Sequence, residues 1–440
     1  MHDIDSYVKH NGRRVRSLPT AAQCAAQAER LLMSTEASLS SKAHTGPAAV
    51  WRHIFAGFGA SLVGIGLARF AYTPLIPPLI QAHWFAASDV VYLGAANLAG
   101  YLIGALLGRP IAHRATNTRT LRAMMVLVSL AFLACWFPLS VTWFFIWRLL
   151  SGVAGGTIMV LVAATVLPRV PAERKGLASG AIFLGLGVGI AASGTIVPLL
   201  LNLGLRSTWI GLAAVSAVLT LATWGGWPSA AKHHAHAALS AKPHNPSKVR
   251  VLYAEYALMA LGLVPTMVFL VDFIARGLGA GAHVGALYWI LYGVGAIFGA
   301  PVYGFFTDRC GGRFAIRLVS LLQVVAIAVF AMSGNRIVIG ALTLVIGSFP
   351  PGIVPMMLAR VHEVVPHDHA RQNIVWSRVT TTFAAFQAMA GYACSALFNA
   401  SGGNYRLLFA IGAVALMFVV IVDCGACWIA QERGQKRDIG

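Results

Sequence analysis

The sequence GFFTDRCGGR, residues 304–313, joins two long apolar segments at 284–306 and 314–333. Its glycines permit a tight turn. Asp308 can cap the N-terminus of a facing helix and can pair with Arg309 or with another basic group. The stretch therefore predicts a short polar loop between two membrane-spanning helices, with charges that can bind a neighbouring helix when the two come together.

The composition of the 440-residue chain is that of a membrane protein. Hydrophobic residues make up 58% of it and charged residues 11%, and the mean hydropathy is +0.73. Soluble domains are about 25% charged, so this chain has too few polar residues to cover a water-exposed surface. Its apolar runs are long and uninterrupted, unlike the alternating segments of about ten residues in outer-membrane barrels. The composition predicts an all-α membrane protein.

The apolar segments number twelve, six on each side of a polar stretch at 229–250. They lie at 54–81, 89–111, 120–139, 142–167, 177–202, 207–228, 251–275, 284–306, 314–333, 337–361, 374–399 and 405–430. We expect each to cross the membrane as a helix. The domains expected from this pattern are a disordered cytoplasmic tail at 1–53, six-helix bundles at 54–228 and 251–430, a cytoplasmic linker at 229–250 and a cytoplasmic tail at 431–440. Met33 is an alternative start of the chain.

The positive charge of the chain predicts its orientation. The formal net charge is +19, which in a soluble protein would suggest binding to nucleic acid. Here most Lys and Arg residues fall in the tails and in alternate loops, while the opposite loops carry Arg206, Arg276, Arg336 and Arg406. Basic residues keep loops in the cytoplasm, so we expect both termini to be cytoplasmic in a bacterial inner membrane, with no nucleic-acid partner.

The sequences of the two halves resemble each other at a constant offset of 196 residues. Gly108 aligns with Gly304, and the loop after each of these glycines is basic. Two parallel repeats of six helices would produce such an offset. The match is incomplete, because Ala112 stands where the second half has Asp308. We therefore expect an aspartate of this loop to pair with a basic group in the second half alone.

Arg148, Gly152 and Gly156 recur at a spacing of four within one apolar segment, so they lie on one face of a helix. The glycines allow another helix to approach closely, while the guanidinium points inward. This pattern is similar to the R-x-x-x-G-x-x-x-G helix of the major facilitator superfamily. The stretch at 304–313 resembles the G-x-x-x-D-R-x-G-[RK] loop of the same superfamily. The resemblance implies a gating role for both sets, which in the loop comprises Gly304, Asp308, Arg309 and Gly311.

A more specific resemblance lies in the first apolar segment, which contains GIGLARFAYTPLIPPL at 64–79. Together with YLIG at 101–104, GLVPT at 262–266 and the segment from Gln387 to Gly391, it is similar to the YbfB-like group of the major facilitator superfamily. The resemblance covers residues 54–430. It implies a fold of twelve transmembrane helices in two pseudo-symmetric halves, and a transporter that works by alternating access.

Arg69 lies deep in the first apolar segment, where a charge is costly unless it faces a cavity or a partner. Arg148 is the second cation expected to point inward. No carboxylate of matching depth is evident, so our hypothesis is that a small organic anion binds Arg69 through two hydrogen bonds. The alternative is that Arg69 pairs with Asp272 or Asp89 and that Arg148 binds helix ends and carbonyl groups.

Other polar residues on the helices that border the cavity in this fold are expected to bind the substrate with Arg69. They are Tyr72, Thr73, Thr266, Gln387 and Tyr392. Each can instead form a hydrogen bond between helices. Protons are the expected coupling ion, with Asp272 as the first candidate to carry them and Glu255 as the second.

The sequence contains no G-x-x-x-x-G-K-[ST] loop, so an ion or substrate gradient is the expected source of energy. We predict a monomeric secondary transporter of a small molecule, with no cofactor, no metal and no enzymatic activity. A small organic anion is the preferred substrate, and efflux of sugars or mixed hydrophobic compounds is the alternative. A non-transporting sensor and a membrane enzyme using the His and acidic residues at 362–369 remain as remote alternatives.

Overall fold

The computed structural model describes residues 47–171, 174–228, 246–366 and 369–438. Its internal contacts group Trp51–Gly440 into one compact unit. The predicted tail up to residue 46, with the alternative start at Met33, and the linker residues 229–245 lie outside the described residues.

The described residues form helices and connecting turns and contain no strand. The first helical stretch comprises α2 (Pro47–Ser61), the π-helical η1 (Leu62–Leu67), α3 (Ala68–Phe70), the 3₁₀ turn η2 (Thr73–Leu75) and α4 (Ile76–Gln81). The rest of the first half consists of α5 (Ala87–Ala115), α6 (Asn117–Ala134), α7 (Val141–Val166), α8 (Lys175–Leu201) and α9 (Leu205–Thr223), with 3₁₀ turns at Leu167–Arg169 and Trp224–Gly226.

The second half repeats this plan. It consists of α10 (Pro246–Asp272) with the π-helical η6 (Phe273–Gly277), α11 (Ala282–Cys310), α12 (Gly312–Met332), α13 (Arg336–Gly347), α14 (Phe349–Val364), α15 (His369–Ala400) and α16 (Tyr405–Asp438). Ten of the helical stretches in the described residues are long and apolar enough to cross a membrane. The prediction of a helical membrane protein with twelve spanning stretches is confirmed by this arrangement and by the fold comparison given below.

Several helix boundaries differ from the apolar segments. The helix predicted at 251–275 begins at Pro246, and the helix predicted at 405–430 continues to Asp438. In both cases the added residues are polar. They can be helical outside the membrane because a helix satisfies the hydrogen bonds of its own backbone. The segment 337–361 is two helices, α13 and α14, which meet at Ser348. Pro350 and Pro351 follow this junction and lack the N–H groups that a continuous helix would need.

Glycines bring the helices of each half into backbone contact. A Cβ atom added to Gly156 of α7 would lie 2.0 Å from the carbonyl oxygen of Tyr101 in α5, and one added to Gly152 would lie 2.1 Å from that of Asn97. In the second half, a Cβ atom on Gly295 of α11 would lie 2.0 Å from the carbonyl oxygen of Leu344 in α13. These distances leave no room for a side chain, so the packing of α5 on α7 and of α11 on α13 requires glycine.

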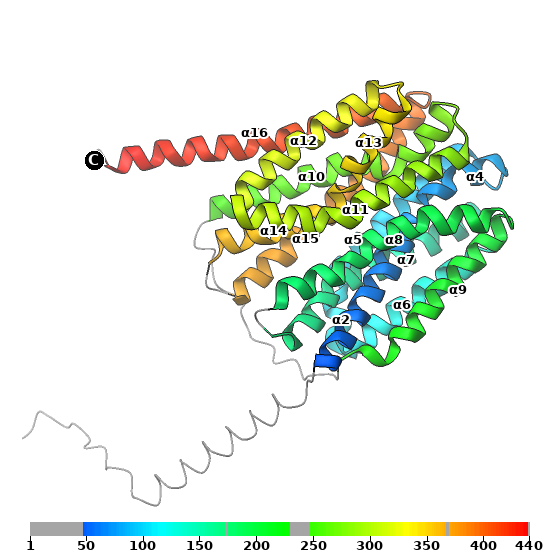
Figure 1. The fold of residues 1–440 in the computed structure, drawn as a ribbon, viewed down its shortest axis with the longest axis horizontal. Coiled ribbons are helices and arrows are strands. Elements are labelled where there is room, and N and C mark those ends of the chain that lie inside the picture. Colours follow the sequence, from blue (N-terminus) through cyan, green and yellow to red (C-terminus); the bar gives the residue numbers. More distant parts are fainter. Residues whose placement is uncertain (1–46, 172–173, 229–245, 367–368, 439–440) are drawn as a thin grey trace, which may run out of the picture. The chain divides into compact units, whose positions relative to one another are not determined.

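The two halves meet through two helix pairs, α8 with α11 and α5 with α15 (Figure 1). Small residues again line the contact, since a Cβ atom on Gly187 of α8 would lie 2.8 Å from the carbonyl oxygen of Ala296 in α11. A Cβ atom on Gly391 of α15 would lie 2.6 Å from the Leu98 side chain in α5. The irregular first stretch, η1 to α4, lies between the two halves and contacts α7, α8 and α10.

Candidate functional site

Arg148 of α7 holds the irregular first helical stretch in place. Its side chain is buried, and its Nη1 donates a hydrogen bond to the carbonyl oxygen of Ala68 at 2.9 Å. The guanidinium lies over the ring of Tyr72, 4.2 Å from the ring centroid. Asn97 of α5 supports this arrangement by donating to the hydroxyl of Ser151 at 2.9 Å and to the carbonyl oxygen of Arg148 at 3.3 Å. Arg148 therefore makes the carbonyl contact expected under the alternative interpretation of this residue.

Arg69 of α3 has unused hydrogen-bonding capacity. Its guanidinium lies 5.1 Å from the ring centroid of Tyr101 and 5.5 Å from that of Phe70. Its Nε and Nη2 atoms are buried and have no hydrogen-bond partner among the described residues. Cation–π contacts offset part of the cost of burying the charge, but they do not satisfy these N–H donors. Two donors on one guanidinium are thus available to an acceptor that the protein itself does not supply.

A small cavity of about 20 Å³ lies between the halves beside these arginines. Its described lining contains two guanidinium groups and no carboxylate. The lining residues are Arg69, Tyr72, Thr73, Ile76, Gly94, Asn97, Leu98, Arg148, Met267 and Val268. A volume of this size holds about one water molecule, so an organic molecule enters only after the halves move apart.

Neither acidic residue considered as a partner of Arg69 is bound to it. Asp272 of α10 accepts hydrogen bonds from Nε and Nη2 of Arg276, both at 2.5 Å, and from the Tyr405 hydroxyl at 2.7 Å. Asp89 has no ion pair with any residue that the structure describes. The described lining of the cavity therefore carries positive charge that no carboxylate of the lining balances. Proton coupling through Asp272 stays a prediction, and it would require this three-residue contact to open.

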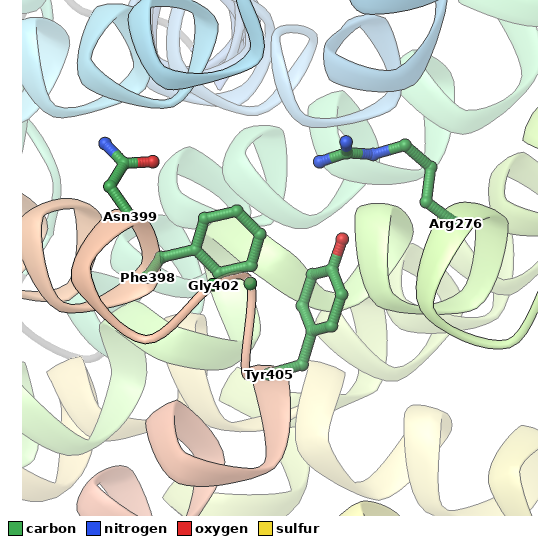
Figure 2. Close-up of a pocket in the computed structure, with 6 residues that line it drawn as sticks. Arg276, Phe398, Asn399, Gly402 and Tyr405 are labelled. Atoms are coloured by element: carbon green, nitrogen blue, oxygen red, sulfur yellow. The ribbon is translucent and has the colours of Figure 1, made fainter.

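A second, open pocket of about 380 Å³ lies next to the Asp272 contact, on the predicted outer side. Figure 2 shows the hydroxyl of Tyr405 and the guanidinium of Arg276 projecting into the same space as Phe398 and Asn399. The charge of Arg276 is already balanced by Asp272, so this pocket does not offer a free cation.

The other residues predicted to bind substrate differ in how their polar groups are used. The hydroxyl of Tyr72 donates to the carbonyl oxygen of Val90 at 2.7 Å. Thr73 and Thr266 likewise donate to backbone carbonyl groups: Thr73 to that of Met267 at 3.1 Å, which joins the two halves, and Thr266 within its own helix at 3.1 Å. These hydroxyls are already paired, so in this conformation they offer only their lone pairs to a ligand.

Two predicted residues on α15 remain available. Both polar atoms of the Gln387 amide are buried without a hydrogen-bond partner in the described part of the chain. Tyr392 is partly buried on the same helix. Their participation in the site stays a prediction.

Sequence reasoning missed Tyr292 of α11. Its side chain is fully buried near Arg69, and its hydroxyl lies beside that of Thr266 without a well-formed hydrogen bond to a described residue. Its ring stacks on Trp289 with centroids 4.6 Å apart, and the indole N–H of Trp289 donates to Ser193 of the other half at 2.9 Å. The spacing of three between Trp289 and Tyr292 places both on one helix face, and this was the available signal.

The stretch at 304–313, predicted as a loop, is helical except at Gly311, because α11 continues to Cys310 and α12 begins at Gly312. It binds α14 rather than a helix of the first half. The backbone N–H of Gly312 donates to Oε1 of Glu363 at 2.6 Å. Gly311 joins α11 to α12 with a φ of +80°, a conformation that favours glycine. Asp308 and Arg309 are exposed, and neither forms an ion pair with a residue that the structure describes. Their gating contact, and that of Gly304, therefore stays a prediction for another conformation.

Comparisons with known proteins agree with this architecture. A family model described as "Uncharacterised MFS-type transporter YbfB" matches residues 61–424. The chain belongs to this family. It is therefore a multi-pass membrane transporter of the major facilitator superfamily rather than an enzyme, and the predicted family is confirmed. No curated protein matches the chain.

A solved structure supports the same fold. The crystal structure of a D-xylose-proton symporter is similar to the chain with a TM-score of 0.67 and 14% sequence identity. The match covers 83% of this chain and 96% of the symporter. At this identity the likeness establishes the fold of this YbfB-family transporter and does not extend to its substrate.

Proposed function

We propose that this YbfB-family transporter carries a small organic anion, most simply a carboxylate, by alternating access to a site at Arg69. One observation carries the proposal: Arg69 retains two buried, unpartnered N–H donors beside a cavity whose described lining has no carboxylate. A buried charge in a membrane costs about 2.5 to 3.5 kcal/mol or more unless it is compensated. A bound anion would supply the missing charge and both acceptors.

The chemistry of the surrounding groups suits a carboxylate with polar or aromatic substituents. A guanidinium binds a carboxylate through two parallel hydrogen bonds. The amide of Gln387 is buried and has no hydrogen-bond partner among the described residues, and the Tyr292 hydroxyl lies beside that of Thr266. Both groups would bind a second part of the ligand. The rings of Phe70 and Tyr101, which lie against the Arg69 guanidinium, would provide apolar contact.

Alternating access would be controlled around this site. Arg148, with its bond to the carbonyl of Ala68, would fix the first helical stretch, while Gly152 and Gly156 keep α7 against α5 as that stretch moves. The loop residues Asp308 and Arg309 would bind the facing half when the cytoplasmic side closes. We propose that the transporter acts as a monomer in a bacterial inner membrane with both termini in the cytoplasm, as its basic loops predict.

Solute exchange in proteoliposomes tests the substrate class. Full-length protein would be reconstituted with one unlabelled compound inside, and entry of the labelled compound would be followed for a panel of small carboxylates, sugars and cationic drugs. We expect exchange of carboxylates, with no exchange by liposomes lacking protein. Exchange of sugars or cations, together with none of any carboxylate, would contradict the proposal.

A sugar is the second candidate, because one feature of the site favours it. The stacked Trp289 and Tyr292 rings are buried near Arg69 and would pack against a sugar ring if the halves move apart. The Tyr292 hydroxyl and the Gln387 amide would then bind sugar hydroxyls. The D-xylose-proton symporter has the same fold, but its substrate is a property of that protein. With a sugar as substrate, the Arg69 charge would stay without a partner.

A further inference from the structure

A second cluster of charges lies in the second half, at the predicted cytoplasmic end, and it shares no residue with the cavity beside Arg69. Its centre is Asp423 of α16, whose side chain is 1% exposed. Arg313 of α12 donates from Nε to Oδ1 of Asp423 at 3.0 Å, and Arg317 of the same helix binds Oδ2. Both oxygens of this buried carboxylate are therefore occupied.

Glu255 of α10 lies beside Asp423 in this cluster but is not paired. Its side chain is 0% exposed, and neither carboxyl oxygen accepts a hydrogen bond from a described residue. When protonated, Glu255 can donate a hydrogen bond to the adjacent Asp423. Its charged neighbours are Arg360 of α14, Asp423 of α16 and Arg313 of α12. Arg313 is already bound to Asp423. Arg360 is bound to Glu363 and its Nη2 also lies 4.0 Å from Oδ1 of Asp423.

The remaining helices that pack against α10 bring no buried charge to this place. Of the Asp, Glu, Lys and Arg side chains that the structure describes on α11 and α15, none is buried. Asp308, Arg309 and Arg378 are exposed, and Arg371 is partly buried. The charge of Glu255 is thus set by one adjacent carboxylate and by arginines that have other partners.

Burial and the adjacent Asp423 favour the neutral form of Glu255, against the attraction of Arg360 and Arg313. An ionised carboxylate without hydrogen bonds loses its hydration energy in the membrane interior, and a second carboxylate at its side adds repulsion. We propose that Glu255 is the proton-binding site of this transporter, protonated in the conformation described and deprotonated in another step of the cycle. The proton is exchanged with water on the predicted cytoplasmic side.

Arg360 supplies the link between this proton and the rest of the protein. Its Nη1 donates to Oε2 of Glu363 at 2.7 Å, and its buried Nε has no partner among the described residues. When Glu255 loses its proton, Arg360 is the neighbouring cation with an unused donor and is drawn toward it. That movement weakens the pair with Glu363, whose other oxygen binds the N–H of Gly312 at the start of α12. Protonation of Glu255 is thereby coupled to the position of the loop at 304–313.

This inference rests on the chain being a transporter, and it does not depend on the anion proposed for Arg69. Its test therefore needs no substrate. Infrared difference spectroscopy of the full-length protein in lipid would follow the carbonyl stretch of protonated carboxyl groups as the pH is raised from acid to alkaline. Glu255→Gln is the main variant, because glutamine mimics the neutral form and should leave the fold intact.

We expect the wild type to show a protonated carboxyl band at neutral pH that disappears at alkaline pH, and we expect Glu255→Gln to lack it. Asp272→Asn is the matched control, since Asp272 lies on the same helix and is equally buried but fully paired, and it should retain the band. Glu363→Gln releases Arg360, so the band should disappear at a lower pH than in the wild type. A band that persists in Glu255→Gln, or that is lost in Asp272→Asn instead, would overturn the proposal.

Discussion

Arg69→Lys is expected to weaken binding of a transported carboxylate by about 10- to 100-fold. Lysine keeps the positive charge, but its ammonium group cannot form the planar pair of hydrogen bonds that a guanidinium forms with a carboxylate. A charge-assisted hydrogen bond contributes about 1.5 to 3 kcal/mol, and each 1.4 kcal/mol changes a dissociation constant about tenfold. The dissociation constant would be measured by calorimetric titration with the carboxylate that the exchange assay identifies.

The matched control for this variant is Arg206→Lys, which makes the same change at an exposed arginine outside the cavity lining. It should bind the carboxylate as the wild type does. Full affinity in Arg69→Lys would show that Arg69 does not hold the ligand through two hydrogen bonds. Equal losses of affinity in both variants would show that replacing an arginine by lysine weakens binding without any contact at the site.

Gly156→Leu is expected to prevent assembly of the first half. A Cβ atom at this position would lie 2.0 Å from the carbonyl oxygen of Tyr101, and backbone at that distance cannot move aside as a flexible side chain can. Overpacking in protein cores typically costs about 1 to 3 kcal/mol, and a clash with the backbone of a second helix lies at or above the upper end. The yield of monodisperse protein after detergent extraction, and its thermal unfolding, would measure the effect.

Gly180→Leu provides the control for the glycine variant. Gly180 lies on α8, and a Cβ atom there would meet nothing within 4 Å. This variant should be extracted and should unfold like the wild type. If Gly156→Leu behaved in the same way, the close contact between α5 and α7 would not be required for the fold.

Much of the fold could be predicted because the membrane imposes simple rules on the sequence. The length of the apolar segments located the helices. The stretch at 304–313 and the helix face of Arg148, Gly152 and Gly156 indicated the superfamily. Local interruptions were harder to predict. The π-helical segment at Leu62–Leu67 has no sequence signal in its glycines and aliphatic residues, whereas the break at Ser348 is marked by the prolines that follow it.

The site was only partly predictable, because a sequence indicates the depth of a residue but not its partner. The depth of Arg69 indicated an unusual charge, and the structure shows which of its atoms lack a partner. The bond from Arg148 to the carbonyl of Ala68 depends on an irregular turn that periodicity does not reveal. Glu255 ranked second as a coupling residue because nothing in the sequence shows that Asp272 is bound by Arg276 and Tyr405 while Glu255 is left unpaired.

Ligand-induced thermal stabilisation of the purified wild type and of Arg69→Ala tests the central claim most directly. A ligand at about 100 times its dissociation constant should stabilise the folded protein by about 2.7 kcal/mol. The account predicts that small carboxylates raise the unfolding temperature of the wild type and of Arg206→Ala but leave that of Arg69→Ala unchanged. Equal stabilisation of Arg69→Ala by the same carboxylates would contradict it, as would stabilisation of all three proteins by sugars alone.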